Sequence, residues 1–104
     1  DVKDKRVLLV DDMIDTAGTI VQGAQALKDQ GAAEIIACCT HGVFSGPAFE
    51  RLENSVISKI ITLNTIEFDK SKVPSKIQTI SAAPIFAEAI ERIYADLPLS
   101  KLYE

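Results

Sequence analysis

Residues able to bind a charged ligand gather in one short segment of the sequence. Residues 15–19 read Asp-Thr-Ala-Gly-Thr and stand directly before a stretch with helical spacing of apolar residues. In a loop at the start of a helix, several backbone N–H groups can point at one place, and the helix N-terminus adds partial positive charge. Thr16 and Thr19 would add hydroxyl donors, and Gly18 would let the backbone approach a ligand closely. This pattern is typical of a site for a phosphate monoester.

Two further carboxylates, Asp11 and Asp12, stand just before this segment, at the end of the apolar run Val7–Val10. Because like charges repel, they would not bind the phosphate itself. They can accept hydrogen bonds from vicinal hydroxyl groups, or hold a divalent cation with water between. A phosphate loop beside such acceptors predicts a sugar phosphate as the ligand. The alternative is structural: Asp15 or Thr16 caps the helix, and the other two carboxylates form a solvated strand end.

Four segments indicate the strands that would position these residues. The first three are continuous apolar runs, which is typical of strands covered on both faces of a parallel sheet. The fourth alternates apolar and polar residues, which favours a place near the edge of the sheet. The predicted strands are residues 6–10, 34–39, 59–63 and 76–80.

Helical patterns separate the predicted strands. Apolar residues after Gly18 have the spacing of one helical face, and Gly31 would end that helix. Residues 47–52 predict a shorter helix, and a last helix would open near Ser81 and end before Pro98. The alternation predicts an α/β fold, with an open, mainly parallel sheet of about four strands and helices on both faces. In such sheets ligands bind at the carboxyl ends of the strands. Those ends are residues 11–12, 40–42, 64–65 and 81.

The overall composition limits the classes of function. The chain has 104 residues, 47% of them hydrophobic, and a formal net charge of −4, which predicts one globular domain over residues 1–104. The acidic balance argues against nucleic acid as a partner. No apolar run approaches the roughly 18 residues of a membrane span, and the first residues are not those of a secretory signal. The adjacent Cys38 and Cys39 indicate no disulfide framework, so we expect a reducing, cytoplasmic location.

The segment Asp-Asp-Met-Ile-Asp-Thr-Ala-Gly-Thr at residues 11–19 resembles the phosphoribosyl-diphosphate-binding motif of the type I phosphoribosyltransferase fold. Within that fold, the sequence most resembles the ribose-phosphate pyrophosphokinase family. The likeness covers nearly the whole chain and continues through residues 37–48, 64–65, 81, 87–90 and 99–103. Members of that family transfer a diphosphate group from ATP to the anomeric hydroxyl of ribose 5-phosphate, with Mg²⁺.

The resemblance implies roles for individual residues. The 5-phosphate would be held by the loop residues Asp15, Thr16, Ala17, Gly18 and Thr19. Asp11 would contact the ribose hydroxyls with Asp12 close by, and both carboxylates are candidates for holding the metal. Ser100 and Tyr103 fall in a region that, in the family, forms subunit contacts and a regulatory site for phosphate or ADP.

Some functional segments of the family do not occur in this sequence. The family's catalytic Lys and Arg loop precedes the motif, as does its ATP-binding segment with a metal-binding His, and neither occurs in these 104 residues. The chain is therefore expected to be the C-terminal domain of a two-domain enzyme, with no catalytic residue of its own and no turnover alone. The implied ligands are ribose 5-phosphate and Mg²⁺, with ATP bound mostly by the other domain. The complete enzyme is expected to be a homo-oligomer built from dimers.

Three other functions stay open at this point. A purine or pyrimidine phosphoribosyltransferase shares the phosphate loop, although residues 40–47 and the tail favour the pyrophosphokinase. A signalling receiver domain also has paired carboxylates after its first strand. It needs an Asp after the third strand and a Lys after a later one, where this sequence has Asn64 and Ser81. A non-catalytic regulator of synthetase assemblies would have lost the Thr-x-Gly-Thr loop, which is intact here.

Other polar residues near the predicted strand ends have simpler interpretations. We expect His41 to bond neighbouring loops rather than to act in catalysis. The segment Ser45-Gly46-Pro47 indicates a cap and a helix start. Asn64 and Thr65 would form a polar mouth at the end of the third strand.

Overall fold

Strands and helices alternate along residues 1–103, which the computed structural model describes. The strands are β1 (Arg6–Ile14), β2 (Glu34–Gly42), β3 (Lys59–Leu63) and β4 (Ile77–Ile80). The helices are α1 (Gly18–Asp29), α2 (Ala48–Glu53) and α3 (Ala83–Tyr94), with short 3₁₀ turns at Lys70–Lys72 and Leu99–Tyr103. The α/β alternation predicted from the sequence is confirmed.

The four strands form one sheet in the order β1-β2-β3-β4, and every neighbouring pair is parallel. One row of the sheet runs from Val10 to Cys38, then to Ile61 and Gln78. β4 lies at an edge, as its alternating pattern predicted. Because all strands run the same way, their carboxyl ends meet at one end of the sheet, where the predicted site should lie.

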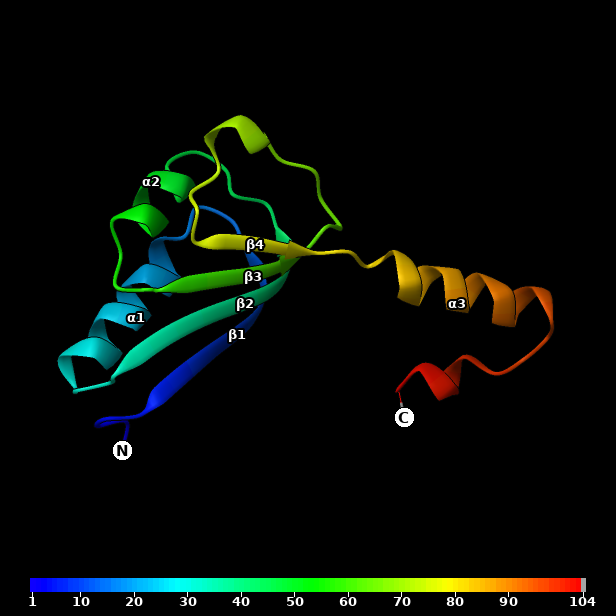
Figure 1. Ribbon diagram of the computed structural model, residues 1–104, viewed down its shortest axis with the longest axis horizontal. Coiled ribbons are helices and arrows are strands. Elements are labelled where there is room, and N and C mark those ends of the chain that lie inside the picture. Colours follow the sequence, from blue (N-terminus) through cyan, green and yellow to red (C-terminus); the bar gives the residue numbers. More distant parts are fainter. Residues whose placement is uncertain (104) are drawn as a thin grey trace.

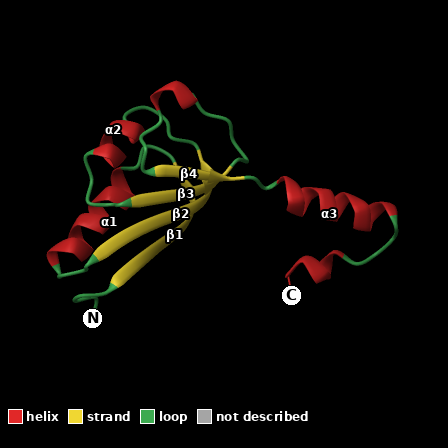
Figure 2. Cartoon of the chain, in the orientation of Figure 1, coloured by secondary structure: helices red, strands yellow, loops and turns green. Residues whose placement is uncertain are grey.

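Helices cover only one face of this sheet, which corrects the prediction of helices on both faces. Figures 1 and 2 show α1 and α2 on the same side, whereas α3 runs away from the sheet. The strand order explains this, because crossovers of one hand that always advance in one direction all fall on the same face. On the other face, the residues Leu8 and Val10 are 58% and 73% exposed.

β1 and β2 are longer at their carboxyl ends than the sequence predicted. The expected strands ended before the polar residues, yet parallel pairing continues as far as Ile14 beside Gly42. Exposed polar side chains on an edge strand do not interrupt the backbone hydrogen bonds of the ladder. Asp11 and Asp12 therefore belong to β1 and not to the loop that follows it.

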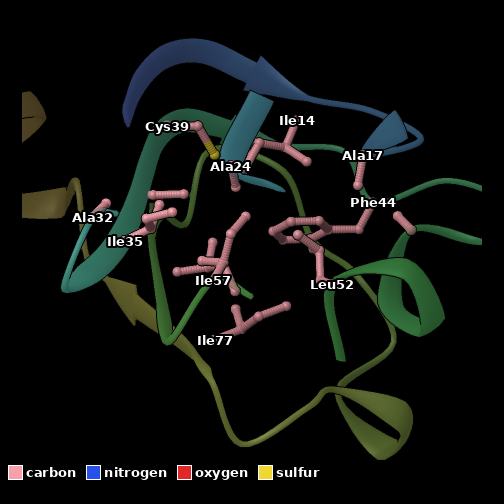
Figure 3. Packing of buried hydrophobic residues seen from close by; sticks show 13 residues of the cluster. Ile14, Ala17, Ala24, Ala32, Ile35, Cys39, Phe44, Leu52, Ile57 and Ile77 are labelled. Carbon is pink, nitrogen blue, oxygen red and sulfur yellow. The ribbon is translucent and has the colours of Figure 1, made fainter. Parts of the chain in front are cut away.

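The core fills the space between the sheet and the helices α1 and α2 (Figure 3). Its largest fully buried apolar side chains are Ile35, Leu52, Ile57 and Ile60. Burying a side chain of this size contributes about 1.5–3 kcal/mol. Three rings, of Phe44, Phe49 and Phe68, pack together with centroids 5.0 to 5.9 Å apart. Since Phe44 lies two residues after the end of β2, the core anchors the end of the sheet at which the site lies.

Lys76 holds the C-terminal end of α2. Its ammonium group donates to the carbonyl oxygens of Leu52, Glu53 and Ser55 at 3.0, 3.0 and 3.1 Å. The last carbonyls of a helix have no partner within the helix, and a cation there also faces the negative end of the helix dipole. A helix of only 6 residues is marginal without such contacts. Lys76 therefore fixes α2 against the start of β4.

One side of α3 is apolar and uncovered. The apolar residues Ile85, Phe86, Ile90 and Ile93 of this helix are between 58% and 67% exposed. α1 and α3, with 12 residues each, are the longest helices of residues 1–103. No helix in that range is long and apolar enough to cross a membrane.

Candidate functional site

The predicted loop residues surround one cavity at the carboxyl end of β1. The cavity has a volume of about 250 Å³ and is lined by the end of β1, the connecting loop and the first turn of α1. It brings together the six residues predicted to bind ribose 5-phosphate, namely Asp11, Asp15, Thr16, Ala17, Gly18 and Thr19. Met13, Ile14 and Ile20 complete the lining.

The start of α1 is open to a ligand. Its N-cap is Ala17, whose side chain has no hydrogen-bonding atom, and no side chain caps the first turn. The structural alternative, in which Asp15 or Thr16 caps the helix, is therefore not the observed arrangement. The first N–H groups of a helix have no acceptor within the helix and carry partial positive charge. An anion in the cavity would supply the missing acceptor.

Ala17 turns the chain sharply from the strand into the helix. Its backbone is left-handed, with φ 69° and ψ 4°, and the residue is only 5% exposed. This conformation costs roughly 1–2 kcal/mol for any residue except glycine. The methyl group of Ala17 belongs to the buried core, which gives a reason for alanine at this position.

Asp15 is held by the loop that follows β2. The Ser45 hydroxyl donates to Asp15 Oδ1, and the Ser45 N–H donates to the Asp15 carbonyl oxygen at 2.9 Å. The N–H groups of Val43 and Phe44 both donate to the Ile14 carbonyl oxygen, at 3.0 and 3.1 Å. The loops after β1 and β2 are thus fastened together, and the Asp15 carboxylate is turned toward Ser45.

Sequence reasoning missed this role of Ser45. The segment was expected to cap or start the second helix, but α2 begins at Ala48, has Pro47 as its N-cap and carries no side-chain cap. The meeting of parallel strand ends already placed residues 40–42 near the phosphate loop. Only the register of the sheet shows that Ser45 is the residue that reaches Asp15.

Arg51, in α2, is a second residue that sequence reasoning missed. Its Nη1 atom donates to the Thr16 carbonyl oxygen at 3.2 Å. Arg51 also lines a groove of about 450 Å³ that borders the phosphate loop at Thr16, Gly18 and Thr19. The two bonded residues are 35 positions apart, so no local spacing relates them.

The paired carboxylates of β1 differ in what they face. As neighbours on a strand, Asp11 and Asp12 project to opposite faces of the sheet, and both are exposed. Asp11 pairs with Cys39 and lines the cavity, whereas Asp12 is not among the lining residues. The Asp12 N–H donates to Asp11 Oδ1 at 2.8 Å, which restrains the Asp11 carboxylate.

The donor set at this site suits magnesium that is shared with a substrate. Mg²⁺ keeps several waters and is usually bound through one or two carboxylates together with substrate phosphates. Asp11 offers one carboxylate at the cavity, which fits that mode. Among residues 1–103, no group of three or more His, Cys, Asp and Glu side chains is placed to hold a metal ion. A metal bound here would therefore take most of its ligands from water and substrate.

His41 and Asn64 tie the neighbouring strand ends together. His41 Nδ1 lies 2.7 Å from Thr65 Oγ1, and that hydroxyl donates to the Thr40 carbonyl oxygen at 3.2 Å. Asn64 Oδ1 accepts from the Ala82 N–H at 2.8 Å. His41 thus bonds a neighbouring loop, as expected, and Asn64 fixes the chain that leads to α3.

The two thiols of β2 lie on opposite faces of the sheet. Cys39 is buried and donates to Thr62 Oγ1 at 3.3 Å, whereas Cys38 is half-buried, and both are free thiols. Burial raises the pKa of the Cys39 thiol above its ordinary value of 9.0. A thiol kept protonated in this way is a poor nucleophile, so Cys39 is a core residue and not a reactive group.

Ser100 and Tyr103 lie far from the cavity. Both belong to the 3₁₀ turn after α3, in the arm that extends away from the sheet (Figure 1). Tyr103 is 89% exposed. The structure does not bring these residues to the phosphate loop, and their regulatory or interface role stays a prediction.

The fold and the cavity define a class of protein: an α/β domain whose parallel sheet ends in a helix-start loop suited to an anion. All 104 residues match the family described as the phosphoribosyl synthetase-associated domain, and the chain belongs to this family. It is 59% identical to a ribose-phosphate pyrophosphokinase of Clostridium tetani and 60% identical to one of Clostridium acetobutylicum, each over 104 residues.

These relatives are longer than the chain. The 104 residues cover 32% and 33% of the two Clostridium proteins, so the chain spans about a third of the curated relatives it matches. A crystal structure of phosphoribosylpyrophosphate synthetase from Mycobacterium smegmatis has the same fold, with a TM-score of 0.89 and 38% identity. That match covers 92% of this chain and 32% of the synthetase chain.

Proposed function

We propose that this chain binds ribose 5-phosphate as part of a ribose-phosphate pyrophosphokinase. The proposed reaction transfers the diphosphate group of ATP to the anomeric hydroxyl of ribose 5-phosphate and releases AMP. The observation that carries the proposal is the uncapped start of α1, which opens into a cavity also lined by Asp11. The names of relatives that are about 60% identical over the whole chain support the same activity.

The 5-phosphate would lie at the first turn of α1. Backbone N–H groups of residues 17–19 would donate to its oxygens, and the exposed Thr16 and Thr19 would add hydroxyl donors. Asp11 would accept hydrogen bonds from the ribose hydroxyls, which orients the sugar ring. Donors that are already in place need no reorganisation when the charged ligand binds.

In the proposed transfer, the anomeric oxygen attacks the β-phosphorus of ATP and gives up its proton. The bond from that phosphorus to the oxygen bridging to the α-phosphorus breaks, and AMP leaves with that oxygen. Mg²⁺, when bound, would neutralise charge on the phosphate oxygens. Of the two carboxylates predicted to hold it, we propose Asp11, which lines the cavity, whereas Asp12 projects to the other face of the sheet. The contribution of this chain is to fix the sugar so that its anomeric oxygen is presented in line.

The groups that stabilise the transferred diphosphate would come from outside this chain. No Lys or Arg lines the cavity. We therefore infer that residues 1–104 are one domain, the C-terminal one, of a two-domain enzyme whose other domain supplies the catalytic Lys and Arg and most of the ATP site. The reading frame upstream of Asp1 tests this inference. A Lys- and Arg-bearing loop preceded by a further α/β domain is expected, and its absence would refute the assignment.

The proposed enzyme is a homo-oligomer built from dimers. The uncovered apolar side of α3 supports contacts with other protein surfaces, and Ser100 and Tyr103 in the same arm would serve subunit contact or regulation. The free thiols of Cys38 and Cys39 support a reducing compartment, the cytoplasm. Light scattering of the complete enzyme tests the assembly, and a monomer would contradict it.

Calorimetric titration of the 104-residue chain tests the binding proposal. We expect it to bind ribose 5-phosphate, to bind inorganic phosphate more weakly and to show no heat with ribose. Equal binding of ribose and ribose 5-phosphate would show that the loop does not recognise the phosphate. The chain alone should release no AMP from ATP and ribose 5-phosphate, and measurable release would contradict its proposed dependence on a second domain.

In the complete enzyme, Asp15→Ala and Thr19→Ala should each raise the KM for ribose 5-phosphate or abolish turnover. Each lost contact should cost roughly 1–3 kcal/mol. Ser71→Ala is the matched control, because its exposed hydroxyl bonds Asp69 in a turn away from the cavity. Unchanged kinetics in the two loop variants would refute the assignment of the site.

A further inference from the structure

Arg51 contacts the phosphate loop from outside the cavity. Its backbone N–H donates to the Pro47 carbonyl oxygen at 3.0 Å, which holds it in α2, and its Nη1 donates to the Thr16 carbonyl oxygen at 3.2 Å. Arg51 is not among the residues that line the cavity of about 250 Å³, and it lines the neighbouring groove of about 450 Å³. Its influence on a ligand in the cavity must therefore pass through the loop.

Gly18 leaves the space that this guanidinium occupies. A Cβ atom at Gly18 would lie 3.1 Å from Arg51 Nη1, which is tighter than ordinary van der Waals contact. The backbone of Gly18 is not left-handed, so conformational freedom is not the reason for glycine there. The missing side chain instead lets Arg51 lie against the first residue of α1.

The Thr16 carbonyl couples Arg51 to the ligand cavity. The C=O of a trans peptide and the N–H that follows it point in opposite directions. Holding the Thr16 carbonyl toward Arg51 therefore turns the Ala17 N–H away from Arg51. The same peptide leads into Ala17, whose left-handed backbone is unfavourable for every residue except glycine. A hydrogen bond from a charged donor to the adjacent carbonyl stabilises that arrangement.

The charge of Arg51 suits this position. Asp11 and Asp15 both line the cavity that would receive a phosphate dianion. A cation inside the cavity would compete with the ligand for space. From the groove side, Arg51 brings a positive charge to the loop without occupying the space of the ligand.

We propose that Arg51 is a positioning residue for ribose 5-phosphate, which holds the Thr16–Ala17 peptide so that the Ala17 N–H faces the cavity. The inference rests on the proposed function, because it concerns the same phosphate site. It requires that Arg51 acts by orienting the backbone and makes no contact with the phosphate.

A double-mutant cycle tests this role by calorimetric titration with ribose 5-phosphate. Arg51→Met should weaken binding about tenfold, or about 1.4 kcal/mol. Ala17→Gly makes the left-handed conformation favourable without help. In that background, Arg51→Met should weaken binding by less than about threefold. Arg6→Met is the matched control. Arg6 is also exposed, but it stands at the start of β1, at the end of the strand away from the cavity, and pairs with Glu34. The Arg6→Met variant should bind ribose 5-phosphate as tightly as the wild type.

Equal losses from Arg51→Met in both backgrounds would overturn the proposal, because an effect of charge alone does not depend on the conformation of residue 17. NMR of the ligand-free chain provides an independent measurement. The Cα and Cβ shifts of Ala17 should move in the Arg51→Met variant and stay constant in Arg6→Met, and unmoved Ala17 signals would also overturn the proposal. If Ala17 responds to Arg51→Met but the wild type does not bind ribose 5-phosphate, the positioning contact stands and the proposed function fails.

Discussion

Replacing Gly42 with alanine should disturb the core and the candidate site together. A Cβ atom at Gly42 would stand 2.4 Å from Phe44 Cε2, 2.8 Å from Phe44 Cζ and 2.9 Å from Thr62 Oγ1. Carbon atoms in contact are normally about 3.5–4.0 Å apart, so the Phe44 ring would have to move by roughly 1 Å or more. Phe44 is buried, and its ring centroid lies 5.4 Å from that of Phe49 and 5.0 Å from that of Phe68. The ring therefore has little space into which it could move.

Overpacking of a core lowers the free energy of unfolding by about 1–3 kcal/mol. Because the neighbouring rings leave Phe44 little space, we expect Gly42→Ala to lose about 2–3 kcal/mol, the upper half of that range. For a chain of this size, each kcal/mol lowers the Tm by about 4–8 °C, so we expect a fall of at least about 8 °C. The site should suffer too, because the Phe44 N–H anchors the Ile14 carbonyl oxygen at 3.1 Å. Losing that bond should weaken the binding of ribose 5-phosphate by about fivefold, or roughly 1 kcal/mol.

Thermal and urea unfolding followed by circular dichroism measure the stability, and titration with ribose 5-phosphate measures the site. Gly23→Ala is the matched control, because a Cβ atom at Gly23 would meet no atom within 4 Å. Gly23 lies inside α1, where alanine should stabilise by about 0.5–1 kcal/mol. The two glycine variants should therefore shift the Tm in opposite directions. A Gly42→Ala variant as stable as the wild type would refute the reasoning from close contact.

The remaining predictions concern a helix end, the loop clamp and a buried thiol. Lys76→Met should lower the free energy of unfolding by about 1–3 kcal/mol in urea, because it leaves the carbonyls of Leu52 and Glu53 in α2, and that of Ser55 just after it, without their donor. Ser45→Ala should weaken ribose 5-phosphate binding severalfold in calorimetry with little change in Tm, because the Asp15 carboxylate loses its donor. A large fall in Tm that accompanies the loss of affinity would contradict this local effect. A thiol reagent should modify the half-buried Cys38 before the buried Cys39 in the folded chain. Since the raised pKa keeps Cys39 protonated when folded, the unfolded chain ionises first, and stability should fall as the pH rises above the ordinary value of 9.0. When urea unfolding is measured at pH 8 to 10, the free energy of unfolding of Cys39→Ala should fall less with pH than that of the wild type. An equal pH dependence in both would contradict a raised pKa of Cys39 in the folded chain.

The strands could be predicted where their own residues decide their limits. The apolar run at residues 59–63 predicted β3, which occupies Lys59–Leu63. Limits that depend on a partner strand could not be predicted in this way. β1 continues past Asp11 and Asp12 to Ile14 because its pairing with β2 resumes at Met13 and Ile14, although the carboxylates alone indicate a strand end.

The covering of the sheet also could not be inferred from single strands. Leu8 and Val10 make the first strand apolar on both faces, yet they lie on the face that α1 and α2 leave open. Apolar residues show that a face is suited to burial. The order of the strands decides where the connecting helices of this chain go, and that order is a property of the whole sheet.

The six cavity residues could be found from the sequence because all but one of them are consecutive and need only a local turn to converge. The residues that brace the loop could not be found in the same way. Ser45 lies 30 positions after Asp15, and Arg51 lies 35 positions after Thr16. Their contacts depend on the register of β2 and on the packing of α2, which no pattern in the sequence specifies.

The match between strand order and chain order bears on how the protein is made. Each strand joins the edge left by the one before it, so no strand has to be inserted between two that are already paired. The residues that line and brace the cavity all lie between Asp11 and Arg51. Partners that are close along the chain pair quickly, and domains begin to fold during translation. We therefore expect the segments that line and brace the cavity, which are neighbours along the chain, to pair early in folding.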